Sequence, residues 1–145
     1  MPDASVYVAG EGHATKYLPY YRQLSNYATG QIYYPPYFFN GARPVINSIS
    51  ANTMTRGGML SITTPNASSI RSVVLMGLPS VTHAMNITQS YVPLTIISRN
   101  SGRLNVQIPT EPNTLPAGTY MLFIVNNKEV PSVAKFVSIV GFSRQ

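Results

Sequence analysis

The sequence predicts an all-β fold whose main part is an immunoglobulin-like antiparallel β-sandwich. Short runs of apolar and β-branched residues recur between residues 45 and 141 at a spacing of roughly 10–15 residues, with turn-forming residues between them. No stretch carries a convincing amphipathic-helix period, and the prolines mostly stand near the ends of the apolar runs. These features are typical of a sandwich of seven strands. The absence of Cys and Trp excludes a true antibody-type domain, which needs both.

Each of the seven expected strands has its own local pattern. The strands are expected at residues 45–50, 59–63, 72–76, 92–98, 104–109, 119–126 and 133–140. The runs at 72–76 and 119–126 are almost wholly apolar, as in central strands, and glycine-containing turns precede 59–63 and 119–126. In the run at 104–109, Leu104, Val106 and Ile108 share one face and polar residues the other. Residues 99–103 include Gly102 and have the length of a hairpin connection.

Residues 1–44 differ from this pattern and are treated as a separate segment, with residues 45–145 as the sandwich domain. Only two strands are expected here, at residues 5–10 and 31–39, the second running into Pro35-Pro36. Six of the ten tyrosines lie between Tyr17 and Tyr34. They either cover apolar surface or form a platform on which a sugar stacks; adjacent Tyr33 and Tyr34 must point to opposite faces, which favours the cover.

Composition narrows the classes of function. Charged residues make up only 10% of the chain, and its net charge of +6 is spread so that no two basic residues are adjacent, which argues against nucleic-acid binding. No apolar run approaches the ~20 residues that cross a membrane. The start of the chain has no signal-peptide pattern, whereas two N-glycosylation sequons, at residues 66–68 and 86–88, lean towards a secreted parent protein.

Five segments of the chain stand out as a set: QIYYPPYF at 31–38, Ala42-Arg43-Pro44, SVTHAMNITQSYVPL at 80–94, LPAGTYMLFIVNN at 115–127 and Val130-Pro131-Ser132. In this order they resemble the C-terminal region of the galactose oxidase and glyoxal oxidase family of copper radical oxidases, with details closer to glyoxal oxidase. The resemblance implies that the sandwich is the family's E-set domain. It also implies that residues 1–44 are a remnant of the Kelch-type propeller that precedes this domain.

His83 is the candidate metal residue. It lies in the connection between the strands expected at 72–76 and 92–98, and the resemblance matches it to the histidine that a sandwich loop passes into the propeller to ligate copper. The family's other ligands are an axial tyrosine and a histidine that precede the last propeller strands, and a tyrosine cross-linked to cysteine. The opening residues PDASVYVAG are similar to the strand that follows the Tyr-His pair, so the chain is expected to begin just after it.

The chain alone is therefore expected to bind no cofactor and to catalyse nothing. A protein copper site needs about three or four ligands in fixed geometry, and His83 is the one matched ligand. The other imidazole, His13, stands in the glycine-rich GEGHAT stretch and is expected to be an ordinary loop residue. Without cysteine the thioether-tyrosine cofactor cannot form within this chain.

The sequence leaves two functions open. The first is a C-terminal fragment of a glyoxal-oxidase-like enzyme that, when complete, oxidises an aldehyde or primary alcohol with O₂ and releases H₂O₂. The alternative is an independent secreted binding module, lectin-like or for cell-surface interaction, that uses the sandwich and the tyrosine-rich segment. Two lone strands are marginal in water, so residues 1–44 are expected to contact the missing propeller or to self-associate.

Overall fold

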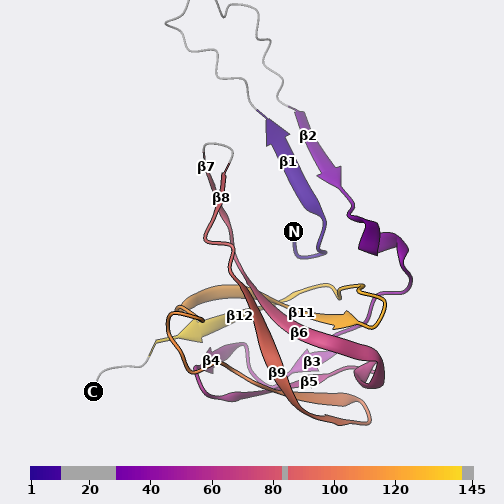
Figure 1. Ribbon diagram of the computed structural model, residues 1–145, viewed down its shortest axis with the longest axis vertical. Coiled ribbons are helices and arrows are strands. Elements are labelled where there is room, and N and C mark those ends of the chain that lie inside the picture. The colour runs from indigo at the N-terminus through magenta and orange to yellow at the C-terminus, as the bar shows by residue number, and fades with distance from the viewer. Residues whose placement is uncertain (11–28, 83–84, 142–145) are drawn as a thin grey trace, which may run out of the picture.

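The computed structural model describes residues 1–10, 29–82 and 85–141 and consists of β-strands with two short 3₁₀ turns (Figure 1). The elements in chain order are β1 Val6–Gly10, β2 Thr29–Tyr33, η2 Pro36–Phe39, β3 Ser48–Ile49, β4 Thr53–Thr55, β5 Met59–Thr63, η3 Ala67–Ser69, β6 Ile70–Gly77, β7 Ser80–Thr82, β8 Met85–Ile87, β9 Tyr91–Asn100, β10 Arg103–Gln107, β11 Gly118–Asn126 and β12 Lys135–Val140. No helix in these ranges is long and apolar enough to cross a membrane. The expected all-β fold is confirmed.

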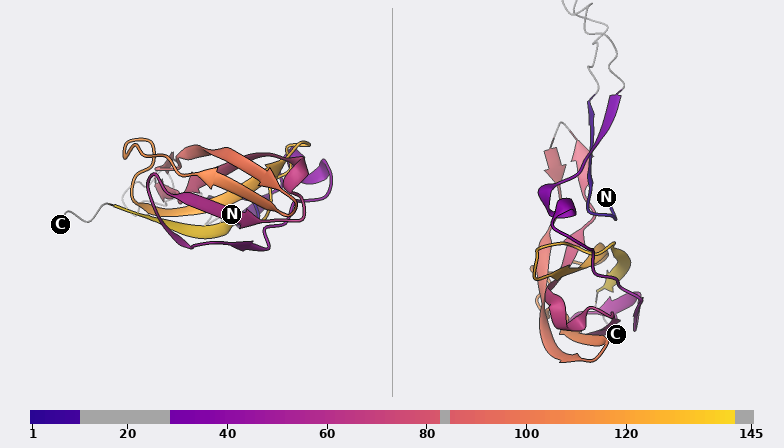
Figure 2. Two further views of the ribbon diagram at one scale, coloured as in Figure 1. Left: turned by 90° about the horizontal axis from the view of Figure 1, so that it is seen from below. Right: turned by 90° about the vertical axis from the view of Figure 1, so that its right-hand side faces the viewer.

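One eight-stranded sheet, in the order β3-β5-β10-β9-β6-β11-β12-β4, curls over itself to make the sandwich (Figures 1 and 2). Strand β9 belongs to both layers, because its first residues pair with β6 and its later residues pair with β10. The β9–β10 register shifts between Asn105 and Val106, which is the irregularity expected where a strand bends sharply. The two layers are therefore joined through β9 rather than formed by two separate sheets.

The main core lies between the two layers and is made by alternate residues of facing strands. Its fully buried side chains include Leu60 and Ile62 of β5, Leu104 and Val106 of β10, Val73 and Leu75 of β6, and Leu122 and Ile124 of β11. Strands with one apolar and one polar face, such as β10, follow the two-residue period of a half-buried sheet. The predicted alternation of Leu104 and Val106 is therefore confirmed.

A second, smaller core covers the opposite face of β6 and β11. Val74, Met121, Phe123 and Ala134 are buried there, with Ala4 packed against them. The N-terminal residues contribute to this cover, since the Ala134 amide donates to the Pro2 carbonyl at 2.8 Å. Burial on both faces explains why β6 and β11 consist of almost continuous apolar residues in the sequence.

Several expected boundaries are wrong. The first sandwich strand is reduced to Ser48–Ile49, and a strand not expected, β4, pairs parallel with β12. Strand β2 begins at Thr29 and ends at Tyr33, and residues 36–39 form a 3₁₀ turn because Pro35 and Pro36 cannot continue a strand ladder. The connection between β6 and β9, expected to be a loop, contains the hairpin strands β7 and β8.

Ser132 joins β11 to the segment that follows it and provides a test of the packing. It is fully buried, its amide donates to the Ile124 carbonyl at 2.8 Å, and its hydroxyl accepts from the Ile124 amide at 3.1 Å. Ser132→Ala leaves a buried N–H without a partner, so urea denaturation should show a loss of about 1–3 kcal/mol in unfolding free energy. Ser101→Ala, at an exposed turn, should stay within about 0.5 kcal/mol of the parent. Equal effects of the two changes would contradict the assigned role of Ser132.

Candidate functional site

A hairpin formed by β7 and β8 projects from the sandwich and carries the sequence-predicted metal residue in its connection. Ser80, Val81 and Thr82 pair with Ile87, Asn86 and Met85 respectively. The chain joins the two strands through His83 and Ala84, which lie outside the described residues. The other histidine, His13, also lies outside them. The structure therefore describes the strands on either side of His83 but not its imidazole.

The foot of the hairpin is held by close backbone contacts. The Gly77 amide donates to the Ser90 carbonyl at 2.9 Å. A Cβ at Gly77 would lie 2.8 Å from both the Thr88 carbonyl oxygen and Ser90 Oγ, which is closer than van der Waals contact allows. Thr88 has φ of 66°, in the left-handed region that β-branched residues rarely occupy. These constraints fix where β7 leaves the sandwich and where β8 returns to it.

Gly77→Ala is expected to displace this foot. The Thr88 carbonyl is backbone and cannot rotate away, so the change should lower the unfolding free energy by about 1–3 kcal/mol, the usual cost of overpacking. Gly141→Ala is the matched control, because a Cβ there meets nothing within 4 Å. Thermal or urea unfolding measures both variants. A Gly77→Ala protein as stable as the Gly141→Ala protein would contradict the tight foot.

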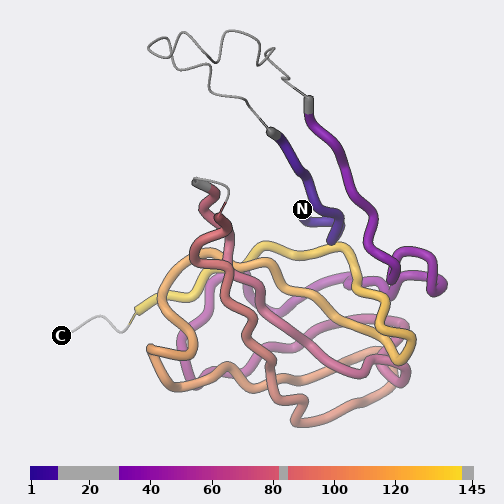
Figure 3. Tube along the Cα trace, turned by 45° about the horizontal axis from the view of Figure 1, so that its top comes forward, coloured from indigo at the N-terminus to yellow at the C-terminus, as the bar shows by residue number. Residues whose placement is uncertain are grey.

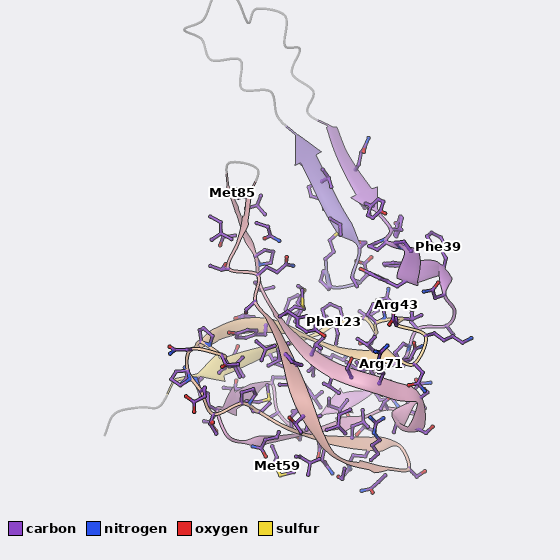
Figure 4. All side chains as sticks on the ribbon, in the orientation of Figure 1. Phe39, Arg43, Met59, Arg71, Met85 and Phe123 are labelled. Atoms are coloured by element: carbon purple, nitrogen blue, oxygen red, sulfur yellow. The ribbon has the colours of Figure 1, made fainter. Side chains whose placement is uncertain are left out.

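The hairpin presents apolar side chains to solvent. Val81 is 73% exposed and Met85 59% exposed, and Ile87 is exposed as well. Figure 4 shows Met85 on the projecting hairpin. A protruding element with this composition is typical of a surface that another structure covers. The described residues of this chain therefore leave these apolar side chains uncovered.

An open hollow of about 740 Å³ lies between the hairpin foot and the turn that leads into β11. Its lining includes Asn86, Thr88, Ser90, Gly118 and Tyr120, and none of the described residues that line it is charged. The Tyr120 hydroxyl already donates to the Pro116 carbonyl at 2.8 Å. Among its described lining residues, no base stands beside a nucleophilic side chain.

A second projecting element, the two-stranded ribbon of β1 and β2, stands on the same side of the sandwich as the hairpin (Figures 2 and 3). Its strands pair antiparallel from Val6–Tyr33 to Gly10–Thr29 and form no further ladder among the described residues. Tyr7, Val8 and Ile32 are about half exposed. Both edges and both faces of the ribbon are thus open to contact within the described part of the chain.

Arg43 anchors η2, which follows the β1–β2 ribbon in the chain, to the sandwich (Figure 4). Its Nε donates to the Pro131 carbonyl at 2.9 Å and its Nη2 donates to the Ser132 carbonyl at 2.7 Å. The guanidinium carbon lies 4.9 Å from the centroid of the Phe38 ring, a cation–π contact. Arg43 therefore joins η2 to the segment after β11.

Tyr37 and Asp3 complete this junction. Tyr37 stacks beside Phe38 and donates its hydroxyl to the Ala4 carbonyl; burial raises the pKa of its phenol. The Asp3 carboxylate accepts from the Ser5 hydroxyl at 2.6 Å, which lowers the pKa of Asp3. Sequence reasoning assigned no role to Arg43, Tyr37 or Gly77. For Gly77, a glycine at the end of an apolar strand was the available signal of a close backbone approach.

Side chains of the types that bind metal ions are few in this chain. Among the described residues, no three His, Cys, Asp or Glu side chains come together. The whole sequence holds two histidines, four acids and no cysteine. Copper prefers imidazole and thiolate donors in a fixed geometry, so an imidazole such as that of His83 has the chemistry of one such ligand.

The curled sandwich with its projecting hairpin defines an early-set domain of the immunoglobulin-like class. The family model "Galactose oxidase-like, Early set domain" matches residues 43–139, and the chain belongs to this family. The chain is also similar to a galactose oxidase of Gibberella zeae, 28% identical over 96% of this chain. A WSC domain-containing protein of Arthroderma benhamiae is 32% identical over 97% of this chain.

Among solved structures, the chain is similar to a fungal alcohol oxidase of the AA5 family in complex with copper. The TM-score is 0.82 at 28% identity, over 97% of this chain and 30% of that one. The chain spans 20% of the length of the galactose oxidases that it matches. The resemblance inferred from the sequence segments is confirmed at the level of the family.

Proposed function

We propose that this chain is the C-terminal part of a larger copper radical oxidase and that it contributes His83 as one copper ligand. The complete protein would oxidise an aldehyde or a primary alcohol and reduce O₂ to H₂O₂. The observation that carries the proposal is the projecting β7–β8 hairpin, whose connection contains His83, in a chain that matches a copper-bound alcohol oxidase over 97% of its length. The galactose oxidase and the alcohol oxidase reported above support oxidase chemistry, and the glyoxal oxidase branch is supported by the residue pattern.

In this proposal, the residues of this chain bind the metal and set the direction of the hairpin. His83 would donate a ring nitrogen to the metal, and the foot at Gly77 and Thr88 would fix the direction in which the hairpin extends. The apolar side chains of Val81 and Met85 would be covered by the surrounding protein and would keep water away from the ligand. Copper would supply the one-electron chemistry that amino-acid side chains alone do not provide.

Residues 1–44 would belong to the last part of a propeller. The open edges of β1 and β2 and the exposed Tyr7, Val8 and Ile32 support this assignment. In the complete protein these edges would pair with other strands of a blade, which removes the risk that open edges carry. The parent protein would be secreted, in agreement with the two sequons.

Calorimetric titration with copper tests the division of labour between this chain and the rest of the protein. The isolated chain is expected to show no tight stoichiometric binding, because a single imidazole is far short of the usual three or four ligands. The complete protein, titrated in parallel, should bind one copper tightly. Tight one-to-one binding by the isolated chain, abolished by His83→Ala, would contradict the claim that this chain contributes only one ligand.

A sugar-binding module is the second candidate function, and the exposed aromatic side chains at residues 33–39 favour it. Tyr33, Tyr34 and Phe39 are exposed, the last by 79%. Aromatic faces open to solvent are suited to stacking on sugar rings. Retention of a sugar at millimolar concentration, lost in a Tyr33→Ala and Tyr34→Ala double variant, would support this function; no retention on a broad glycan panel would remove it.

A further inference from the structure

A surface asparagine directly before η3 has the chemistry of a modification site. We propose that Asn66, in the sequon Asn66-Ala67-Ser68, carries an N-linked oligosaccharide when the chain passes through a secretory pathway. This inference rests on the secretion included in the proposed function. The second sequon, Asn86-Ile87-Thr88, lies in the hairpin and is a poor place for a glycan.

The amide of Asn66 is arranged so that attachment costs no hydrogen bond. Its Oδ1 accepts from the Val45 amide at 3.0 Å. Within the described part of the chain, its Nδ2 donates to no residue, and no buried side-chain nitrogen or oxygen there lacks a partner. This half-buried residue therefore exposes its nitrogen to solvent while its oxygen is engaged. An N-glycan replaces one Nδ2 hydrogen and leaves the carbonyl oxygen free to keep its bond.

The backbone around Asn66 also holds the side chain at the surface. The Asn66 amide donates to Thr64 Oγ1 at 3.1 Å, and the Ser69 amide donates to the Asn66 carbonyl at 2.9 Å. Ala67 is buried in the main core, whereas Ser68, the sequon hydroxyl, is exposed. Because Ala67 packs inside, the transferase must act before this turn folds, and the finished turn then keeps the sugar outside the core.

A glycan on Asn66 would lie far from the β7–β8 hairpin. Asn66 precedes β6, and the hairpin foot at Gly77 ends it, so the eight-residue strand separates them by roughly 25 Å. Asn86, by contrast, pairs with Val81 inside the hairpin and donates its Nδ2 to Gln89 Oε1. An oligosaccharide there would stand three residues from His83 and would obstruct insertion of the hairpin into a surrounding protein.

The covalent step balances with a lipid-linked oligosaccharide as the donor. A bond forms between Asn66 Nδ2 and the anomeric carbon of the first sugar, while the bond from that carbon to the lipid pyrophosphate oxygen breaks. The amide nitrogen gives one proton to a basic group of the transferase, and the lipid pyrophosphate leaves with the electron pair of the broken bond. No change of oxidation state occurs.

Secretion of the full chain from yeast with an added leader peptide tests the proposal, because the route is then imposed by the leader. Peptide mass spectrometry after enzymatic release of N-glycans in ¹⁸O-water identifies the modified residue, and a glycoprotein secreted by the same cells verifies transferase activity. We expect conversion of Asn66 to labelled Asp in most molecules. Ser68→Ala should abolish it without altering the Asn66 amide, whereas Ser101→Ala should leave it unchanged.

The outcomes separate this inference from the copper proposal. An unmodified Asn66 in the secreted chain, or modification of Asn86 in place of Asn66, overturns the glycan assignment and leaves the titration with copper unaffected. Persistence of the sugar signal in Ser68→Ala overturns it as well. Occupied Asn66 together with unchanged thermal unfolding after sugar removal supports it, because the attached chain then lies outside the packed structure.

Discussion

His83→Ala in the complete protein is expected to lower copper affinity by more than about 100-fold, since loss of an outer-shell partner alone costs about 10–100-fold. Turnover should fall with the loss of metal. In the proposed site, His83 is one of only three or four donors, so its removal takes away a large share of the bonds that hold the metal. Copper content after dialysis and peroxide production measure the two effects.

His13→Ala is the matched control, since it removes the only other imidazole of the chain. Its copper content and turnover should equal those of the parent protein. If His13→Ala lost the metal and His83→Ala retained it, the assignment of the ligand would be wrong. The urea midpoints of both variants show whether either change acts through folding instead.

Arg43→Ala is expected to lower the unfolding free energy by about 2–4 kcal/mol, because it removes two hydrogen bonds from a charged donor and leaves carbonyls without their partner. The acceptors belong to Pro131 and Ser132, which are buried. The cation–π contact with Phe38 is lost as well. Urea denaturation measures the change in stability, and limited proteolysis near residue 40 reports whether the ribbon segment has detached.

Arg71→Ala provides the matched arginine control. Arg71 forms an ion pair with Glu129 at 2.7 Å, but the two side chains are 62% and 70% exposed. Exposed pairs contribute about 0–1 kcal/mol, so this variant should be nearly as stable as the parent. Arg43→Lys should fall between the two, because lysine keeps the charge but not the planar pair of donors. Equal effects of Arg43→Ala and Arg71→Ala would contradict the anchoring role.

Strands that pack on the core were predictable from the sequence, because burial leaves a pattern in it. Strand β5 has the bounds expected from its apolar residues and the preceding glycine turn. The near-continuous runs in β6 and β11 indicated central strands, and both are buried on two faces. Strand β4 was missed because it has only three residues and forms through pairing with β12, which is distant in sequence.

The candidate site was predictable only in part. The side chains of Val81 and Met85 are exposed, so the β7–β8 hairpin lacks the apolar pattern of a strand that packs on a core. The sequence therefore indicated a loop. The foot at Gly77 depends on the approach of the Thr88 carbonyl, which no spacing reveals. His83 came from the resemblance of its surrounding residues rather than from its own chemistry, because a single histidine in a neutral run has no intrinsic metal signature.

X-ray diffraction from crystals of the complete, copper-loaded protein at the copper absorption edge tests the central claim most directly. Our account predicts one anomalous peak at bonding distance from an imidazole nitrogen of His83, with every other protein ligand outside residues 1–145. A copper peak whose coordination sphere excludes His83 would contradict it.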